Sequence, residues 1–104
     1  MELSTTYCID GKKIVKHLGL VRGNTIRARH IGKDITALLK NVVGGEISDY
    51  TKMMAESREE ALDRMIAEAQ SLGANAIVGV KFATSEIMQH ASEILVYGTA
   101  VIVE

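Results

Sequence analysis

The stretch that decides the fold is Ser71-Leu72-Gly73-Ala74-Asn75-Ala76-Ile77-Val78-Gly79-Val80-Lys81-Phe82. Gly73 follows the last apolar position of a helical pattern, where a residue without a Cβ readily adopts the left-handed conformation that ends a helix. Asn75 also tolerates that conformation. The residues after Asn75 are short, apolar and β-branched, which predicts a strand over 76–82. We therefore expect a corner here, at which a long helix ends and a buried strand begins.

A long helix is predicted upstream of this corner, from Ser48 or Asp49 to Leu72. Apolar residues recur at helical spacing along one side of it, at positions 54, 61, 62, 65, 66, 69 and 72. Arg58 interrupts that apolar side. Ser57-Arg58-Glu59-Glu60 resembles a capping box, so a second helix start near Ser57 is the alternative to one continuous helix. A shorter helix is predicted over 33–43, ended by Gly44-Gly45.

Four strands are predicted from apolar and β-branched runs: Thr6–Ile9, Ile14–Gly23, Ala76–Phe82 and Glu93–Val103. Asp10-Gly11 indicates a tight turn that joins the first two strands into a hairpin. Residues 83–92 are expected to form a long loop between the last two strands, and residues 24–32 a connection with a short extended piece. Gly19 and Gly23 indicate a bulge, a bend or a close backbone approach, or only a weak point in the strand.

The last predicted strand is apolar on both faces. One face carries Ile94, Val96, Gly98, Ala100 and Ile102, and the other carries Leu95, Tyr97, Thr99, Val101 and Val103. An antiparallel strand with one face in water alternates apolar and polar residues, and one long helix covers only one face. We therefore expect an obligate homo-oligomer in which a second copy covers the other face or joins the sheet edge. The apolar pair Ile87-Met88, in the predicted loop, is expected at such an interface.

Length and composition favour one domain over residues 1–104 and no polyanionic partner. The chain has 12 Lys and Arg against 13 Asp and Glu, for a formal net charge of −1. Its one basic run, from Arg22 to Lys33, has no interleaved aromatic residue, which argues against nucleic acid as a partner. The single cysteine, Cys8, cannot form an internal disulfide, and no apolar run is long enough for a membrane span. A cytoplasmic location and no membrane partner are expected.

Several of these segments resemble one known family. They are Leu18-Gly19-Leu20-Val21-Arg22-Gly23, Gly44-Gly45-Glu46 with Tyr50-Thr51, the stretch from Leu72 to Val80, and Tyr97-Gly98-Thr99-Ala100-Val101. In this order they are similar to the YbjQ-like family, which carries the label "putative heavy-metal-binding domain", and the resemblance covers nearly the whole chain. It implies an α+β subunit similar to the dodecin fold, with a small antiparallel sheet on one long helix plus a short helix, assembled as a homopentameric ring. It implies no established activity and no catalytic residue, and it leaves the cofactor unknown.

The candidate metal ligands are scattered. A soft metal ion requires thiolates and imidazoles that converge, and the compact spacings Cys-x-x-Cys and His-x-x-x-His are both absent. Cys8, His17, His30 and His90 lie in four different predicted segments. Cys8 and His17 could approach across the Asp10-Gly11 turn, but a buried cysteine and a surface histidine explain them equally well. No metal-ligand set is therefore assigned from the sequence.

The ligand-binding candidate is Gly44-Gly45-Glu46, which precedes the long helix. Two glycines before a helix N-terminus expose backbone N–H groups and the positive end of the helix dipole, which favours a small anion. A plain turn between two helices is the alternative, since two helix ends also require glycines.

The expected function is binding of a small molecule or metal ion by the homo-oligomer. A scaffold oligomer without ligand is the alternative, and an enzyme with a site between subunits is the third. No catalytic residue is assigned, because the helix carboxylates of Glu56, Glu59, Glu60, Asp63 and Glu68 lie on the predicted solvent side.

Overall fold

The computed structural model describes residues 1–28, 48–88 and 91–104. The elements in chain order are strand β1 (Glu2–Leu3), strand β2 (Ile14–Ala28), helix α2 (Ser48–Ser71), strand β3 (Ala76–Met88) and strand β4 (Ala91–Val103). The strands form one sheet in the order β1-β3-β4-β2. β4 is antiparallel to both of its neighbours, whereas β1 is parallel to β3. The fold is therefore α+β, and its sheet is mixed rather than purely antiparallel as the sequence suggested.

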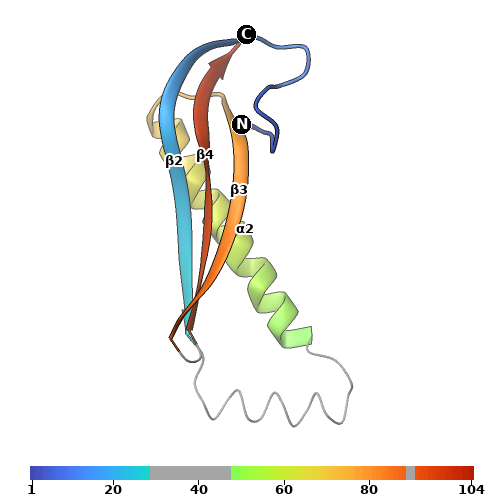
Figure 1. Ribbon diagram of the computed structural model, residues 1–104, viewed down its shortest axis with the longest axis vertical. Coiled ribbons are helices and arrows are strands. Elements are labelled where there is room, and N and C mark those ends of the chain that lie inside the picture. Colours follow the sequence, from blue (N-terminus) through green and yellow to red (C-terminus); the bar gives the residue numbers. More distant parts are fainter. Residues whose placement is uncertain (29–47, 89–90) are drawn as a thin grey trace.

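The three long strands run side by side along the molecule, and α2 crosses the sheet diagonally (Figure 1). The 13 residues of β3 extend over about 43 Å, and the 24 residues of α2 over about 36 Å. Because α2 packs mainly on β2 and β4, it leaves the C-terminal half of β3 uncovered. Residues 76–80 of β3 are buried or nearly so, whereas residues 81–88 are all exposed.

Helix α2 confirms the predicted helix within one residue and runs without a break at Ser57. Its apolar side packs Ala61, Met65 and Ala69, all fully buried, against the strands. Gly73 has φ +87°, and the corner is closed by two backbone bonds: Gly73 N–H to Gln70 O at 3.0 Å and Ala74 N–H to Ala69 O at 3.1 Å. This is the Schellman arrangement, in which a glycine in the left-handed region ends the helix as expected.

A polar contact that the sequence did not predict fixes α2 against β2. Ser57 is fully buried, and its hydroxyl donates to Met53 O at 2.9 Å while it accepts from Arg27 Nε at 2.6 Å. Thr25, also buried, donates to Ser57 O at 3.2 Å, and the Arg27 guanidinium pairs with Glu60. Arg58 lies outside the buried side and is exposed. The buried side of the helix therefore includes Ser57. The sequence pattern had placed Arg58, and not Ser57, on that side.

The predicted N-terminal hairpin is wrong. Residues 4–10 are turns and loop, and β1 lies before them at Glu2–Leu3, paired with Ala76 and Ile77 of β3. The turn at Asp10-Gly11 is present, with Lys12 N–H bonded to Ile9 O at 3.1 Å. The apolar alternation of Thr6–Ile9 was too short to decide between a strand and a loop, and contacts with β3 decided it.

Three strand ends were also wrong. β3 continues to Met88 and β4 begins at Ala91, where a long loop over 83–92 was expected. β2 continues to Ala28 instead of ending at Gly23. Pairing with the neighbouring strand holds polar residues such as Ser85 and Ser92 in regular strand conformation. The intrinsic strand propensity of these residues does not predict this pairing. The predicted helix over 33–43 lies outside the described residues.

Described residues cover the sheet face away from α2, the outer face, at one end only. There Ala76, Val78, Val101 and Val103 form a buried cluster beneath Ile9 and Ile14 of the same chain. Farther along the outer face, Leu20 and Ile26 are 65% and 58% exposed, and Leu95 and Tyr97 are half-buried. The expectation that a second copy must cover all of this face is therefore corrected in part, since the N-terminal segment covers one end.

Asn75 has a role at the corner that its turn propensity did not indicate. Its side chain donates to Val103 O at 2.9 Å and accepts from Val103 N–H at 2.8 Å, which ties the corner to the end of β4. We expect Asn75→Ala to lower the free energy of unfolding by about 2 kcal/mol, because two hydrogen bonds are lost and the Val103 groups are buried. Denaturant unfolding measures this. Asn24→Ala, which removes one exposed contact to Glu93, is the matched control and should change stability by less than about 0.5 kcal/mol. Equal losses for the two variants would contradict the assigned role.

Candidate functional site

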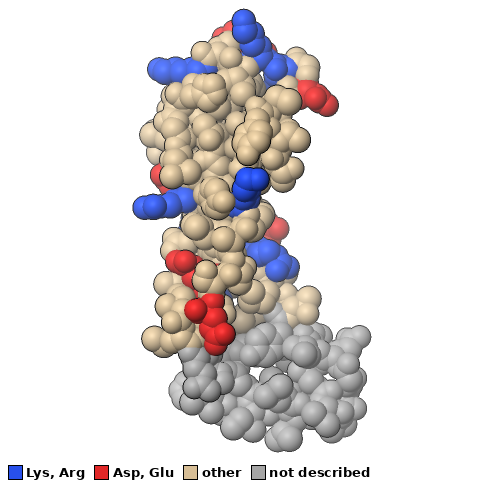
Figure 2. Space-filling view, in the orientation of Figure 1, with Lys and Arg blue, Asp and Glu red and all other residues tan. Residues whose placement is uncertain are grey.

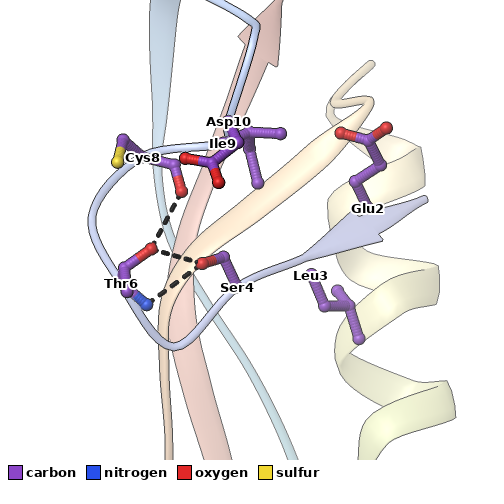
Figure 3. A pocket seen from close by; sticks show the side chains of 7 residues that line it. All are labelled: Glu2, Leu3, Ser4, Thr6, Cys8, Ile9 and Asp10. Atoms are coloured by element: carbon purple, nitrogen blue, oxygen red, sulfur yellow. Dashed lines mark hydrogen bonds between the residues drawn. The ribbon is translucent and has the colours of Figure 1, made fainter.

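A pocket of about 490 Å³ lies in the N-terminal segment. Figure 3 shows its lining, which combines hydroxyl, thiol and carboxylate groups with two aliphatic side chains: Glu2, Leu3, Ser4, Thr6, Cys8, Ile9 and Asp10. All seven residues come from one continuous stretch of chain. The pocket is therefore formed by how residues 2–10 fold back on themselves beside the sheet.

Backbone bonds to β3 hold this stretch in place. Ser4 N–H donates to Ile77 O at 3.0 Å, Gly79 N–H to Thr6 O at 2.8 Å, and Val80 N–H to Ser4 O at 3.0 Å. Gly79 has φ +64°, and a Cβ at this position would lie 2.9 Å from the Tyr7 ring. A glycine is thus required here both by the backbone conformation and by the aromatic side chain that packs on it. The sheet provides a fixed support for the pocket.

The hydroxyl groups of the pocket bond to one another. Thr6 Oγ1 donates to Cys8 O at 3.0 Å, so the 2.6 Å contact between the Ser4 and Thr6 hydroxyls has Ser4 as its donor. Thr6 N–H in turn donates to Ser4 Oγ at 3.0 Å. Glu2 is paired with Lys12 at 2.8 Å, and the Cys8 thiol is free and exposed. The pocket therefore offers a soft thiol and acidic oxygens around a rigid hydroxyl pair, a lining that favours polar or cationic small molecules over anions.

The pocket does not fit a heavy-metal ion held by one chain. Figure 3 shows Cys8 and Glu2 on opposite sides of the pocket, so the thiol and this carboxylate do not converge on one point. Among residues 1–28, 48–88 and 91–104, no three His, Cys, Asp or Glu side chains are grouped to hold a metal. Soft metal ions require several converging thiolate or imidazole donors. Cys8 supplies one such donor here.

The structure places only some of the residues that the sequence singled out. Gly44, Gly45 and Glu46, the anion-site candidate, lie outside the described residues, as do His30 and His90. His17 is exposed on β2, opposite Val101. The described part of the chain contains no helix with the length and apolar character needed to cross a bilayer.

The helix carboxylates and the pocket hydroxyls correct the sequence-based picture further. Glu60 and Glu68 do not lie only in solvent, because they bond to Arg27 and to Arg22 N–H of β2. Ser4 and Thr6, which shape the pocket, were missed. The polar run Ser4-Thr5-Thr6 was the available signal, since clustered Ser and Thr between apolar segments indicate a loop.

Comparisons with known proteins agree on one family for this chain. A UPF0145 protein from Dehalococcoides mccartyi (strain BAV1) is 61% identical over 104 residues and covers 100% of both chains. UPF0145 proteins from Halorubrum lacusprofundi and Methanosarcina acetivorans are 55% and 54% identical over 101 residues, which is 97% of this chain and 97% and 95% of theirs. A crystal structure of a DUF74 family protein of unknown function from Pediococcus pentosaceus has a TM-score of 0.69 at 18% identity, covering 100% of this chain and 98% of that one, and so supports the fold. The family model described as "Putative heavy-metal-binding" matches residues 1–104, and this chain therefore belongs to the YbjQ family.

Proposed function

We propose that this protein is a homo-oligomer that binds a small polar ligand in the N-terminal pocket. The observation that carries the assembly half of the proposal is the apolar surface that the described part of one chain leaves exposed. Leu20 and Ile26 on β2, and Phe82, Ile87 and Met88 on β3, are all at least 46% exposed.

The lengths of the elements account for this exposure. β3 extends over about 43 Å and α2 over about 36 Å, and α2 packs mainly on β2 and β4, so no described element covers residues 81–88 of β3. A second copy would cover this surface.

The outer face is the first surface that we propose for assembly. Leu20 and Ile26 project from β2 on this face, with Arg22 and Asn24 between them, and the half-buried Tyr97 and Leu95 of β4 lie opposite Arg22 and Asn24. Figure 2 shows that the upper part of the visible face is largely uncharged below the Lys and Arg side chains at its end, whereas charged side chains of both signs lie over its middle and lower parts. Exposed apolar patches on soluble proteins mark interaction sites. The family resemblance supports five copies in a ring.

The ligand of the N-terminal pocket is proposed from the chemistry of its lining. Cys8 supplies a soft donor, and Glu2 and Asp10 supply acidic oxygens, so the proposed ligand is a small polar molecule with cationic or donor groups. A metal ion would need further donors from a neighbouring copy. We propose no catalytic step and no nucleic-acid or membrane partner, and we propose the cytoplasm as the location.

A scaffold oligomer without ligand is the second candidate. It is favoured by one observation, which is that several polar groups of the pocket already have partners within the chain. Ser4 and Thr6 bond to each other, and Glu2 is paired with Lys12. A pocket built to receive a ligand leaves such groups available more often.

Native mass spectrometry of freshly purified protein tests both halves of the proposal. We expect a mass several times that of one chain, and a retained ligand that is absent after denaturation. Leu20→Lys combined with Ile26→Lys should reduce the assembled fraction, because two charges would be buried in an apolar interface. Leu72→Lys, at an exposed site beyond the end of α2, is the control and should leave assembly unchanged.

The possible outcomes separate the candidates. An oligomer with no retained mass, and no binding of copper, zinc or cadmium by calorimetry, would support the scaffold. A monomer at micromolar concentration would contradict both candidates.

A further inference from the structure

Parts of both edges of the sheet are covered by this chain itself. On β2, Arg22 N–H bonds to Glu68 and Asn24 O accepts from Arg64 at 2.6 Å, so side chains from α2 occupy that edge. The first part of the β3 edge is occupied by residues 2–6, and the last of these bonds is made by Val80 N–H. Unpaired strand edges attract other strands, and proteins usually cover them in such ways.

The β3 edge from Lys81 to Ile87 has no such cover in the described part of the chain. Residues 81–88 are exposed throughout, and no described segment pairs with this edge. Phe82 and Ile87 are 46% and 51% exposed. The regular part of this open edge begins after a register shift between Val78 and Lys81 and ends at one between Glu86 and Met88, so it covers residues 81–86.

The register of the sheet shows which backbone groups are open. In an antiparallel ladder, successive residues direct their N–H and C=O groups to opposite sides. Since Arg22 and Asn24 direct theirs outward, β2 bonds to β4 through Val21, Gly23 and Thr25, whose partners are Gly98, Val96 and Ile94. β4 then bonds to β3 through residues 93, 95 and 97, opposite residues 85, 83 and 81. Phe82, Thr84 and Glu86 consequently direct their N–H and C=O groups away from the sheet.

We infer that this edge pairs with the same edge of a second copy, antiparallel and about a two-fold axis at Thr84. The inference rests on the proposed homo-oligomer and names one of its contacts. Thr84 is the middle one of the three residues with outward groups, so pairing that uses all three places Thr84 opposite Thr84 of the second copy and Phe82 opposite Glu86 of the second copy. The six groups of Phe82, Thr84 and Glu86 are then all bonded across the axis.

Side-chain chemistry is compatible with this register. Thr–Thr pairs across antiparallel strands are favourable, and no charged residue faces a like charge. Lys81 lies opposite Ile87 of the second copy, and the two Lys81 side chains are about 20 Å apart along the ladder. Because the contact is isologous, it yields even numbers of copies: a dimer, or ten chains if rings of five are joined.

Cysteine cross-linking in a Cys8→Ser background tests the position of the axis. Directly opposed residues of a bonded pair have Cα atoms about 5.5 Å apart, which suits a disulfide. After mild oxidation, the Thr84→Cys variant should therefore run on a non-reducing gel at twice the mass of one chain. Ala83→Cys and Ser85→Cys are the matched controls. Each of these variants by itself should run as a single chain, because the Cα atoms of the same residue in the two copies are about 8 Å apart. An equimolar mixture of the two variants should cross-link, because residue 83 of one copy lies opposite residue 85 of the other.

A second variant tests the contact without a cross-link. Thr84→Pro removes an outward N–H that the isolated sheet does not use, so it should keep the fold and reduce the assembled mass twofold in native mass spectrometry. Thr84→Val keeps the N–H and should assemble normally. If Cys8→Ser is an oligomer while Thr84→Cys does not cross-link and Thr84→Pro assembles fully, the edge contact is overturned and the proposed oligomer stands. If Cys8→Ser is a monomer, the proposed oligomer itself fails.

Discussion

Gly23→Ala is expected to destabilise this protein by about 3 kcal/mol or more. Gly23 lies on β2 directly beneath α2, and a Cβ there would lie 2.0 Å from Ala61 O and 2.6 Å from Met65 N. Both are backbone atoms of the helix, so no side-chain rotation relieves the collision. The helix would have to move away from the sheet and loosen the fully buried Met65. Thermal unfolding by circular dichroism should show Tm lowered by more than about 12 °C.

Arg22→Ala is the control for this prediction. Arg22 is the preceding residue on the same strand, its side chain is exposed, and the bond to Glu68 is made by its backbone N–H. We expect a change in the free energy of unfolding within about 0.5 kcal/mol. A comparable loss for Arg22→Ala would show that strand propensity, and not the contact between Gly23 and the helix, determines the result.

The second large effect is expected for Met65→Ala. Met65 is one of the largest fully buried side chains and packs among Val21, Ile94 and Val96 between helix and sheet. Removal of its side chain loses the transfer free energy and leaves a cavity, which together cost about 3 kcal/mol. Urea unfolding should show a lower midpoint with an unchanged m-value, because the surface exposed on unfolding stays nearly the same.

Leu72→Ala gives the matched comparison, since both residues belong to the same apolar side in the sequence. Leu72 lies after the end of α2 and is 46% exposed. The expected loss is below about 1 kcal/mol, because half of the side chain already contacts water. Equal losses at Met65 and Leu72 would mean that the helix is buried along its whole length, contrary to the packing observed.

The helix and its end could be predicted because their determinants are local. Apolar residues at helical spacing and a glycine at the position after Leu72 specify α2 and the corner without reference to the rest of the chain. The strands were found, but their ends were not. Ser85 and Ser92 have weak strand propensity and are held by cross-strand pairing.

The pocket could not be predicted for the same reason. Its shape depends on bonds from Ser4 and Thr6 to Ile77, Gly79 and Val80, which lie more than seventy residues later in the chain. The buried Ser57 and the two bonds of Asn75 to Val103 are likewise contacts between distant segments. Such contacts have no signature in the spacing of nearby residues.

The sequence by itself determined the α+β class, the helix over 48–71, the glycine that ends it and the excess of apolar strand residues, because periodicity and backbone conformation act over a few neighbouring residues. Only the tertiary structure decided that Ile9 and Ile14 cover one end of the outer face, that Gly23 lies against the helix backbone, and that no segment among the described residues pairs with the β3 edge after Val80. These features depend on which distant segments meet. That choice is made by the packing of the whole chain.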